Sequence, residues 1–311
     1  MSAPRRVLGV ALLAMGCGGA APSATSAPVD SLAVGVPITD TNGWVELTLG
    51  TAPLVLVAPH GGSIAPASLA DRSCAVCVTG NDANTQDLAR RIVESFAQRT
   101  GRRPQLVVNR LDRAKFDANR DRDEATGGAP VLFDTWATFH RFIDSASARA
   151  VRAGNGRALL LDLHGHAHPI ARIELGYLLS ESTLRASDAT IQAALTQSSI
   201  ARLVVDRRSG DDPLTVLRGA TSFGGALAAA GYAAVPSPTA PAPLVGEPFF
   251  DGGYNTQRHG SRAGGVVDAI QLEHPFPGLR DSAANRQRYA DSLAAITVRF
   301  LQRQYGWTPA R

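Results

Sequence analysis

The fold is decided by Arg157-Ala-Leu-Leu-Leu-Asp-Leu-His-Gly-His-Ala-His168. This apolar run follows the turn residues Asn155-Gly156, and its length and composition predict a buried parallel strand. The polar residues then lie at the C-terminal end of the strand, which in open α/β sheets faces the ligand crevice. Histidines occupy positions 164, 166 and 168, and neutral imidazole is a common zinc ligand. The pattern therefore predicts either a metal site or a solvated histidine-rich loop.

Strands and helices alternate along the rest of the chain. The expected strands cover residues 44–49, 52–58, 104–109, 173–179, 201–205 and 265–273. The expected helices cover residues 84–100, 134–153 and 282–305. This order predicts an α/β fold with a mostly parallel or mixed central sheet and helices on both faces. The Pro- and Gly-rich residues 236–253 lack periodicity and are expected to form either a lid or a passive surface loop.

The N-terminus has the pattern of an export signal. Arg5-Arg6 precede the apolar residues 7–16, a segment too short to span a bilayer. Leu12-Leu-Ala-Met-Gly-Cys17 resembles a bacterial lipobox, and an ordinary secretory signal cut nearby is the alternative. We expect a signal peptide at residues 1–16, a lipidated Cys17 and flexible tether at 17–35, and a single catalytic domain at 36–311. The chain would then be lipid-anchored in the bacterial cell envelope, facing the periplasm or the exterior.

The charge of the chain argues against one class of partner. The formal net charge is +4, and removing residues 1–16 takes away Arg5 and Arg6 and no acids, which leaves 4 − 2 = +2. Nucleic-acid-binding proteins instead concentrate basic charge on one face. The expected partners are therefore a small substrate and, through the lipid on Cys17, the membrane.

Cys74 and Cys77 form a C-x-x-C pair. This spacing fits a redox pair, half of a zinc site or a structural disulfide. A complete cysteine-type zinc site needs two further ligands, and none follows nearby in the sequence. Because an exported chain meets an oxidising compartment, we favour a disulfide that closes a small loop.

Polar side chains follow several of the predicted strands. His60 comes after the strand at 52–58, Asp82 precedes the first helix, and His164 and Glu273 end later strands. Each has an ordinary alternative explanation, as a turn residue, a helix N-cap or a solvated side chain. The C-terminal ends of parallel strands meet at one edge, however, and arginines follow the strand at 104–109. Together these residues make up the inventory of a hydrolytic zinc site.

Five motifs, in this order, resemble those of the N-formylglutamate amidohydrolase family. They are Pro59-His-Gly-Gly62, Asp82-x-x-Thr85-x-x-Leu88, Asp117-Ala-Asn-Arg120, Asp162-Leu-His-Gly165 and Ile270-Gln-Leu-Glu273. That family is related in fold to zinc carboxypeptidases and to the succinylglutamate desuccinylase and aspartoacylase group. The resemblance covers most of the chain between His60 and Glu273, and it implies one zinc ion per chain.

The resemblance also implies roles for individual residues. His60 and His164 match the first and last zinc ligands. Zinc carboxypeptidases carry a glutamate three residues after the first histidine, but this chain has Ser63 there. Asp82 is therefore the implied third ligand, with Asp87 as the runner-up.

Further residues are implied to contact the substrate. Asn119 and Arg120 match a pair that holds a substrate carboxylate, Arg113 would polarise the scissile carbonyl, and Glu273 matches the general base. From its position near the 236–253 segment, we expect Arg258 to touch the substrate. His166, His168 and His259 would contact the substrate, support the metal ligands or serve the structure only.

The expected function is that of an exported, zinc-dependent hydrolase of linear amide bonds. Its substrate would be an N-acyl amino acid or small peptide with a free carboxylate, attacked by metal-activated water. Two alternatives stay open. One is a carboxypeptidase-like hydrolase of cell-wall peptides, and the other is a non-catalytic lipoprotein that binds a metal or a solute.

Overall fold

The computed structural model describes residues 33–74 and 77–309. The expected signal peptide, the lipidated Cys17 and nearly all of the tether lie outside these residues. Within the described ranges, no helix is both long and apolar enough to cross a bilayer.

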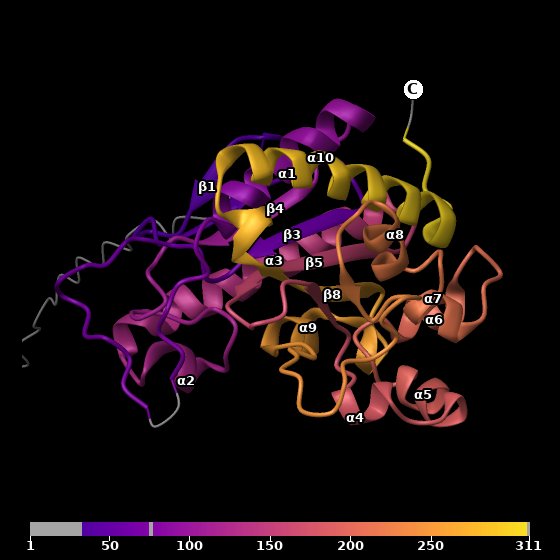
Figure 1. The fold of residues 1–311 in the computed structure, drawn as a ribbon. Helices are drawn as coiled ribbons and strands as arrows, with labels where there is room; N and C mark the ends of the chain where they lie inside the picture. The colour runs from indigo at the N-terminus through magenta and orange to yellow at the C-terminus, as the bar shows by residue number, and fades with distance from the viewer. Residues whose placement is uncertain (1–32, 75–76, 310–311) are drawn as a thin grey trace, which may run out of the picture.

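An eight-stranded mixed sheet forms the centre of the molecule (Figure 1). The strands are β1 (Pro37–Thr39), β2 (Val45–Thr48), β3 (Leu54–Ala58), β4 (Gln105–Asn109), β5 (Ala158–His166), β6 (Ile173–Gly176), β7 (Ala234–Val235) and β8 (Val267–Pro275). Across the sheet the order is β1-β2-β4-β3-β5-β8-β6-β7. The central strands β4, β3, β5 and β8 are parallel, whereas β2 and β6 pair with them antiparallel. The predicted α/β fold with a mixed sheet is confirmed.

Ten α-helices accompany the sheet in the described residues. They are α1 (Thr85–Thr100), α2 (Arg122–Thr126), α3 (Phe133–Ala153), α4 (Glu181–Leu184), α5 (Asp188–Leu195), α6 (Ala201–Asp206), α7 (Pro213–Arg218), α8 (Phe223–Ala229), α9 (Tyr254–His259) and α10 (Ala283–Phe300). The predicted long helices correspond to α1, α3 and α10, within a few residues at each end.

The sheet is buried on both faces because its strands are apolar on both sides. Along β3, Leu54 and Leu56 belong to the core shared with α1 and α10, whereas Val55 and Val57 belong to the core shared with α3. α1 and α10 lie side by side on one face (Figure 1), and α3 crosses the other. The layers leave open the edge where β3, β4, β5 and β8 all end.

One predicted strand, at 201–205, is wrong, because these residues form α6. The start of this helix is held by distant acceptors. The N–H of Leu203 donates to Asp268 Oδ1 at 2.8 Å and the N–H of Arg202 to Ser261 Oγ at 2.9 Å. The strand predicted at 173–179 is shorter than expected, since β6 ends at Gly176 and Leu178 takes a positive φ of 63°.

Candidate metal centre

A cavity of about 550 Å³ opens at the C-terminal ends of the parallel strands. The segment 236–253 contributes Phe250, Gly252 and Gly253 to its wall. Seven of the eight predicted site residues line it, namely His60, Asp82, Arg113, Asn119, Arg120, His164 and Glu273. The strand-end positions noted in the sequence are therefore brought together in one place, as expected.

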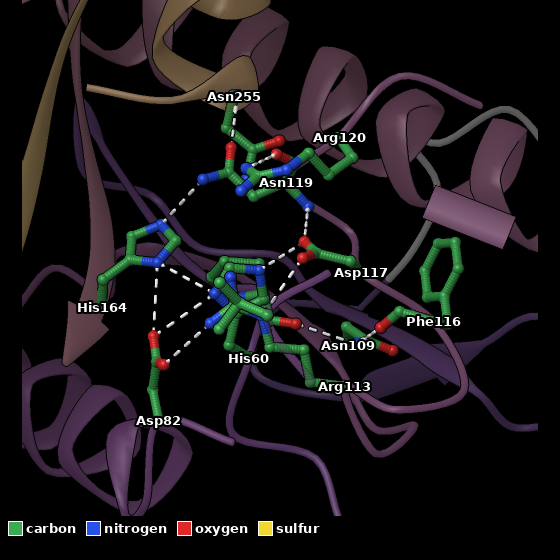
Figure 2. A network of polar contacts seen from close by, with 12 residues as sticks. His60, Asp82, Asn109, Arg113, Phe116, Asp117, Asn119, Arg120, His164 and Asn255 are labelled. Atoms are coloured by element: carbon green, nitrogen blue, oxygen red, sulfur yellow. Dashed lines mark hydrogen bonds and ion pairs between the residues drawn. The ribbon is translucent and has the colours of Figure 1, made fainter. Parts of the chain in front are cut away.

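Three possible metal ligands meet in this cavity (Figure 2). His60 Nδ1 lies 3.1 Å from His164 Nδ1 and 3.3 Å from Asp82 Oδ2, and His164 Nδ1 lies 3.4 Å from the same oxygen. Atoms held tetrahedrally at zinc–ligand distances of about 2.0–2.1 Å are about 3.3 Å apart. The spacing of the two nitrogens and the oxygen therefore fits a zinc ion bound between them.

Carboxylates behind the two imidazoles fix which ring nitrogen faces the cavity. His60 Nε2 lies 2.6 Å from Asp117 Oδ1, and His164 Nε2 lies 2.9 Å from Asp162 Oδ2. An ionised carboxylate only accepts hydrogen bonds, so each Nε2 carries a proton and donates it. When the rings are neutral, both Nδ1 lone pairs then point toward Asp82. This carboxylate–histidine arrangement is typical of metal ligands in proteins.

The electrostatics of the site favour a cation. Burial alone would raise the pKa of Asp82, but its interactions with His60 and His164 hold this pKa below its ordinary value. Burial would lower the pKa of His164, yet the carboxylates of Asp162 and Asp82 raise it well above its ordinary value. The cluster thus has a high affinity for positive charge, which either a proton or a metal ion can supply.

Glu273 lies beside these candidate ligands because the β5–β8 register pairs it with His164. Its Oε1 is 3.9 Å from His164 Nδ1 and accepts a hydrogen bond of 3.0 Å from Gln271 Nε2. Its Oε2 is buried and has no hydrogen-bond partner among the described residues. Burial raises the pKa of Glu273 to about 8, the charge of His164 opposes this shift, and that of Asp82 adds to it. The result is a carboxylate with a high affinity for a proton and one unoccupied oxygen.

Arg113 binds the candidate ligand Asp82 and also Asp117, the carboxylate behind His60. Its Nη1 donates to Asp82 Oδ1 at 3.3 Å and its Nε donates to Asp117 Oδ2 at 3.1 Å. This guanidinium is buried and lines the cavity. The arginine therefore both orients the ligand set and brings positive charge to the cavity wall.

Asn119 and Arg120 enter the cavity from the loop before α2. Asn119 Oδ1 accepts the N–H of Asn255 at 2.7 Å, and the N–H of Asn119 donates to Asp117 Oδ1 at 3.0 Å. Arg120 Nε donates to Glu124 Oε1 at 2.8 Å, and its side chain is partly exposed. Asn119 is thus held firmly. The guanidinium of Arg120 is bound by a surface carboxylate and by the carbonyl of Asn119 at 2.9 Å, and it can exchange the surface carboxylate for a ligand.

Arg258 does not line this cavity, contrary to the prediction for it. Its guanidinium carbon lies 5.3 Å from the ring centre of Trp136 on α3. His259 also points elsewhere, since its Nε2 lies 2.9 Å from His140 Nδ1 and its Nδ1 lies 3.1 Å from Asp144 Oδ1. Both side chains fasten α9 to α3.

His166, His168 and Glu174 form a second group of possible ligands, and the two histidines line the same cavity. His166 Nε2 donates to the carbonyl of Arg172 at 2.8 Å, and its Nδ1 accepts the N–H of His168 at 3.1 Å. Both nitrogens of this ring are therefore used, and it offers no lone pair to a metal ion. His168 Nδ1 lies 2.9 Å from Glu174 Oε1.

The structure pairs Cys74 with Cys77 in a disulfide, as predicted. The loop next to this disulfide contacts the candidate ligands indirectly, through Arg72 and Asp117. This buried guanidinium donates to Asp117 Oδ2 at 3.4 Å and to the carbonyl of Val78 at 2.8 Å. The loop thereby backs the carboxylate that orients His60.

Sequence reasoning assigned no role to four residues of the site: Asp117, Asp162, Gln271 and Arg280. Two of them had a local signal. Asp162 precedes His164 by two residues on a strand, so both side chains lie on the same face, and Gln271 stands in the same relation to Glu273. Arg280 had none, because it reaches the cavity from a turn after β8.

Comparisons with known proteins give matches among solved structures only. No protein-family model and no curated protein sequence matches the chain. N-formylglutamate amidohydrolase from Ralstonia eutropha JMP134 is 15% identical with a TM-score of 0.48, covering 83% of this chain and 97% of that one. The gene product Atu2144 from Agrobacterium tumefaciens is 12% identical with a TM-score of 0.48, covering 83% and 94%. The chain is thus similar over most of its length to these two structures.

Proposed function

We propose that this protein is a metal-dependent amidohydrolase that cleaves an N-acyl amino acid or a small peptide with a free carboxylate. One observation carries the proposal. Two histidine nitrogens and a carboxylate oxygen converge beside Glu273 in a cavity large enough for a small molecule. Oε1 of Glu273 lies 3.9 Å from His164 Nδ1, and its buried Oε2 has no hydrogen-bond partner among the described residues. Metal binding alone does not require a buried carboxylate with a vacant oxygen, so this feature favours catalysis over a binding lipoprotein.

His60, Asp82 and His164 would hold the metal. Two imidazoles and one carboxylate suit zinc, and their spacing is that of tetrahedral ligands. A bound zinc ion polarises a carbonyl group and lowers the pKa of water to about 7.

Glu273 would act as the general base. Its Oε2, which has no hydrogen-bond partner among the described residues, can take the proton of the attacking water when Glu273 is ionised. The same proton can then pass to the leaving nitrogen. Gln271 holds the other oxygen through its amide and so orients the carboxylate.

Arg120 and Arg113 would bind the negative charges of the substrate. Arg120 is partly exposed, and the only carboxylate that binds it among the described residues is that of Glu124 on the surface, which a substrate carboxylate can replace. Arg113 lies deeper, between Asp82 and Asp117, and can stabilise the oxyanion that forms when the carbonyl is attacked.

The test is hydrolysis of a panel of N-acyl amino acids by zinc-loaded protein, with release of the free amine measured. Glu273→Gln keeps the shape of the side chain but cannot accept a proton. We expect it to lower turnover roughly 100- to 10,000-fold while bound zinc stays unchanged. Turnover of the variant within a factor of two of the wild type would remove Glu273 from the mechanism. Absence of hydrolysis across the panel and on short peptides would instead favour a binding protein.

A further inference from the structure

Both exposed phenylalanines in the described residues line the candidate active-site cavity. Phe250 is 43% exposed and Phe276 is 40% exposed, and Val78, also exposed, lines the same cavity. Leaving aromatic surface in water costs about 25 cal/mol per Å² relative to burial. Exposed apolar side chains gathered around a cavity with polar groups inside are typical of a ligand site.

Phe250 is held rigidly. Its ring stacks on the ring of His168, with centroids 4.6 Å apart and an angle of 22° between the planes. Its N–H donates to Glu174 Oε2 at 2.8 Å, while Glu174 Oε1 lies 2.9 Å from His168 Nδ1. One fully buried carboxylate therefore fixes both the backbone of Phe250 and the ring beneath it.

Phe276 rests on an equally fixed support. The guanidinium carbon of Arg280 lies 5.4 Å from its ring centre. Arg280 is buried, and its Nε, Nη1 and Nη2 donate to the carbonyls of His274, Ala83 and His166 at 3.1, 2.6 and 3.2 Å. With three nitrogens bound to backbone, this guanidinium cannot move away from the ring without losing hydrogen bonds.

The two supports are joined. Arg280 binds the carbonyl of His166, and the ring of His166 lies 4.9 Å from that of His168. Phe276 and Phe250 are thus the two ends of one continuous wall, which we name the aromatic wall. It consists of Phe250, His166, His168, Phe276 and Arg280.

We propose that the aromatic wall binds a flat apolar group of the substrate, so that the preferred substrates are N-acyl amino acids with an aromatic ring in the acyl group or in the side chain. This inference rests on the proposed amidohydrolase function. A pre-formed apolar surface binds a ligand more tightly, because few of its side chains lose conformational freedom when the ligand binds. The wall lines the same cavity as the candidate metal ligands, and a short acyl group has too little apolar surface to cover it.

The test compares N-benzoylglycine, N-acetylphenylalanine, N-acetylglycine and N-acetylglutamate with zinc-loaded protein. We expect kcat/KM for at least one of the two aromatic compounds to exceed that for both N-acetylglycine and N-acetylglutamate by about tenfold or more, or about 1.4 kcal/mol. Phe250→Ser and Phe276→Ser should each reduce this ratio at least about threefold with bound zinc unchanged. Val245→Ser is the matched control, since Val245 is exposed in the same segment but does not line the cavity.

Calorimetry can measure the binding of N-benzoylglycine and N-acetylglycine to the Glu273→Gln variant. This experiment separates the proposal of the aromatic wall from the proposal of the amidohydrolase function. Tighter binding of the aromatic compound without hydrolysis by the wild type would uphold the aromatic wall and overturn the amidohydrolase. Hydrolysis of all four compounds with equal kcat/KM, or a ratio unaffected by both phenylalanine substitutions, would overturn the aromatic wall and leave the amidohydrolase standing.

Discussion

Replacing Asp162 by Asn tests how the metal ligands are oriented. Asp162 is fully buried, and both of its oxygens accept hydrogen bonds, from His164 Nε2 at 2.9 Å and from Asn255 Nδ2 at 3.3 Å. Asn has one acceptor oxygen and one NH₂ group. In Asp162→Asn, the new NH₂ group must therefore face one of these two donors. The negative charge behind His164 is also lost.

The substitution should lower both the folding free energy and the affinity for zinc. A buried donor left without an acceptor costs about 1–3 kcal/mol of folding free energy. Weaker support of His164 should reduce metal affinity about 10- to 100-fold, because that is the usual effect of removing the carboxylate behind a histidine ligand. The change in zinc dissociation constant corresponds to about 1.4–2.8 kcal/mol.

The assay is competition for zinc against a chromophoric chelator, with urea unfolding of the metal-free protein measured alongside. Asp268→Asn is the matched control, because Asp268 is equally buried on β8 but is bound by Ser261, Tyr305 and Arg157, away from the cavity. It should lower stability and leave the zinc affinity unchanged. Equal zinc affinity in Asp162→Asn and the wild type would refute the orientation of His164 inferred here.

Three other predictions concern the substrate and the anchor. Arg120→Lys should raise KM about tenfold or more with little change in kcat, because Lys keeps the charge but loses the bidentate fork; steady-state kinetics would decide. Gly253→Ala should lower kcat/KM without loss of zinc, since its new Cβ would lie 2.3 Å from Asn119 Nδ2 and 2.7 Å from Gln271 Oε1; unchanged kinetics would contradict this. Cys17→Ser should move the processed protein from the membrane fraction to the soluble envelope fraction, and continued membrane association would contradict the lipid anchor.

The central strands could be predicted because their signal is local. β3, β4, β5 and β8 are apolar on both faces, and each ends at a polar residue or a turn. The helix α6 could not be predicted from the sequence. Its first N–H groups donate to Asp268 and Ser261, which are more than fifty residues away in the chain. The direction of β6, antiparallel to β8, also depends on partners that no local pattern reveals.

The cavity residues at strand ends could be predicted for the same reason. His60, His164 and Glu273 follow β3 or end β5 and β8, and parallel strands bring these ends together. The position of Arg258 could not be predicted, because it depends on how α9 packs against Trp136. Arg280 belongs to a turn whose path is set by tertiary packing.

We propose that His60, Asp82 and His164 together hold a metal ion. The most direct test is metal analysis by plasma mass spectrometry of protein purified without chelator, on the wild type, His164→Ala and Glu273→Gln. We predict about one zinc per chain in the wild type and in Glu273→Gln, and loss of most of it in His164→Ala. Full zinc occupancy in His164→Ala, or a wild type that takes up no divalent metal even when zinc is supplied, would contradict the account.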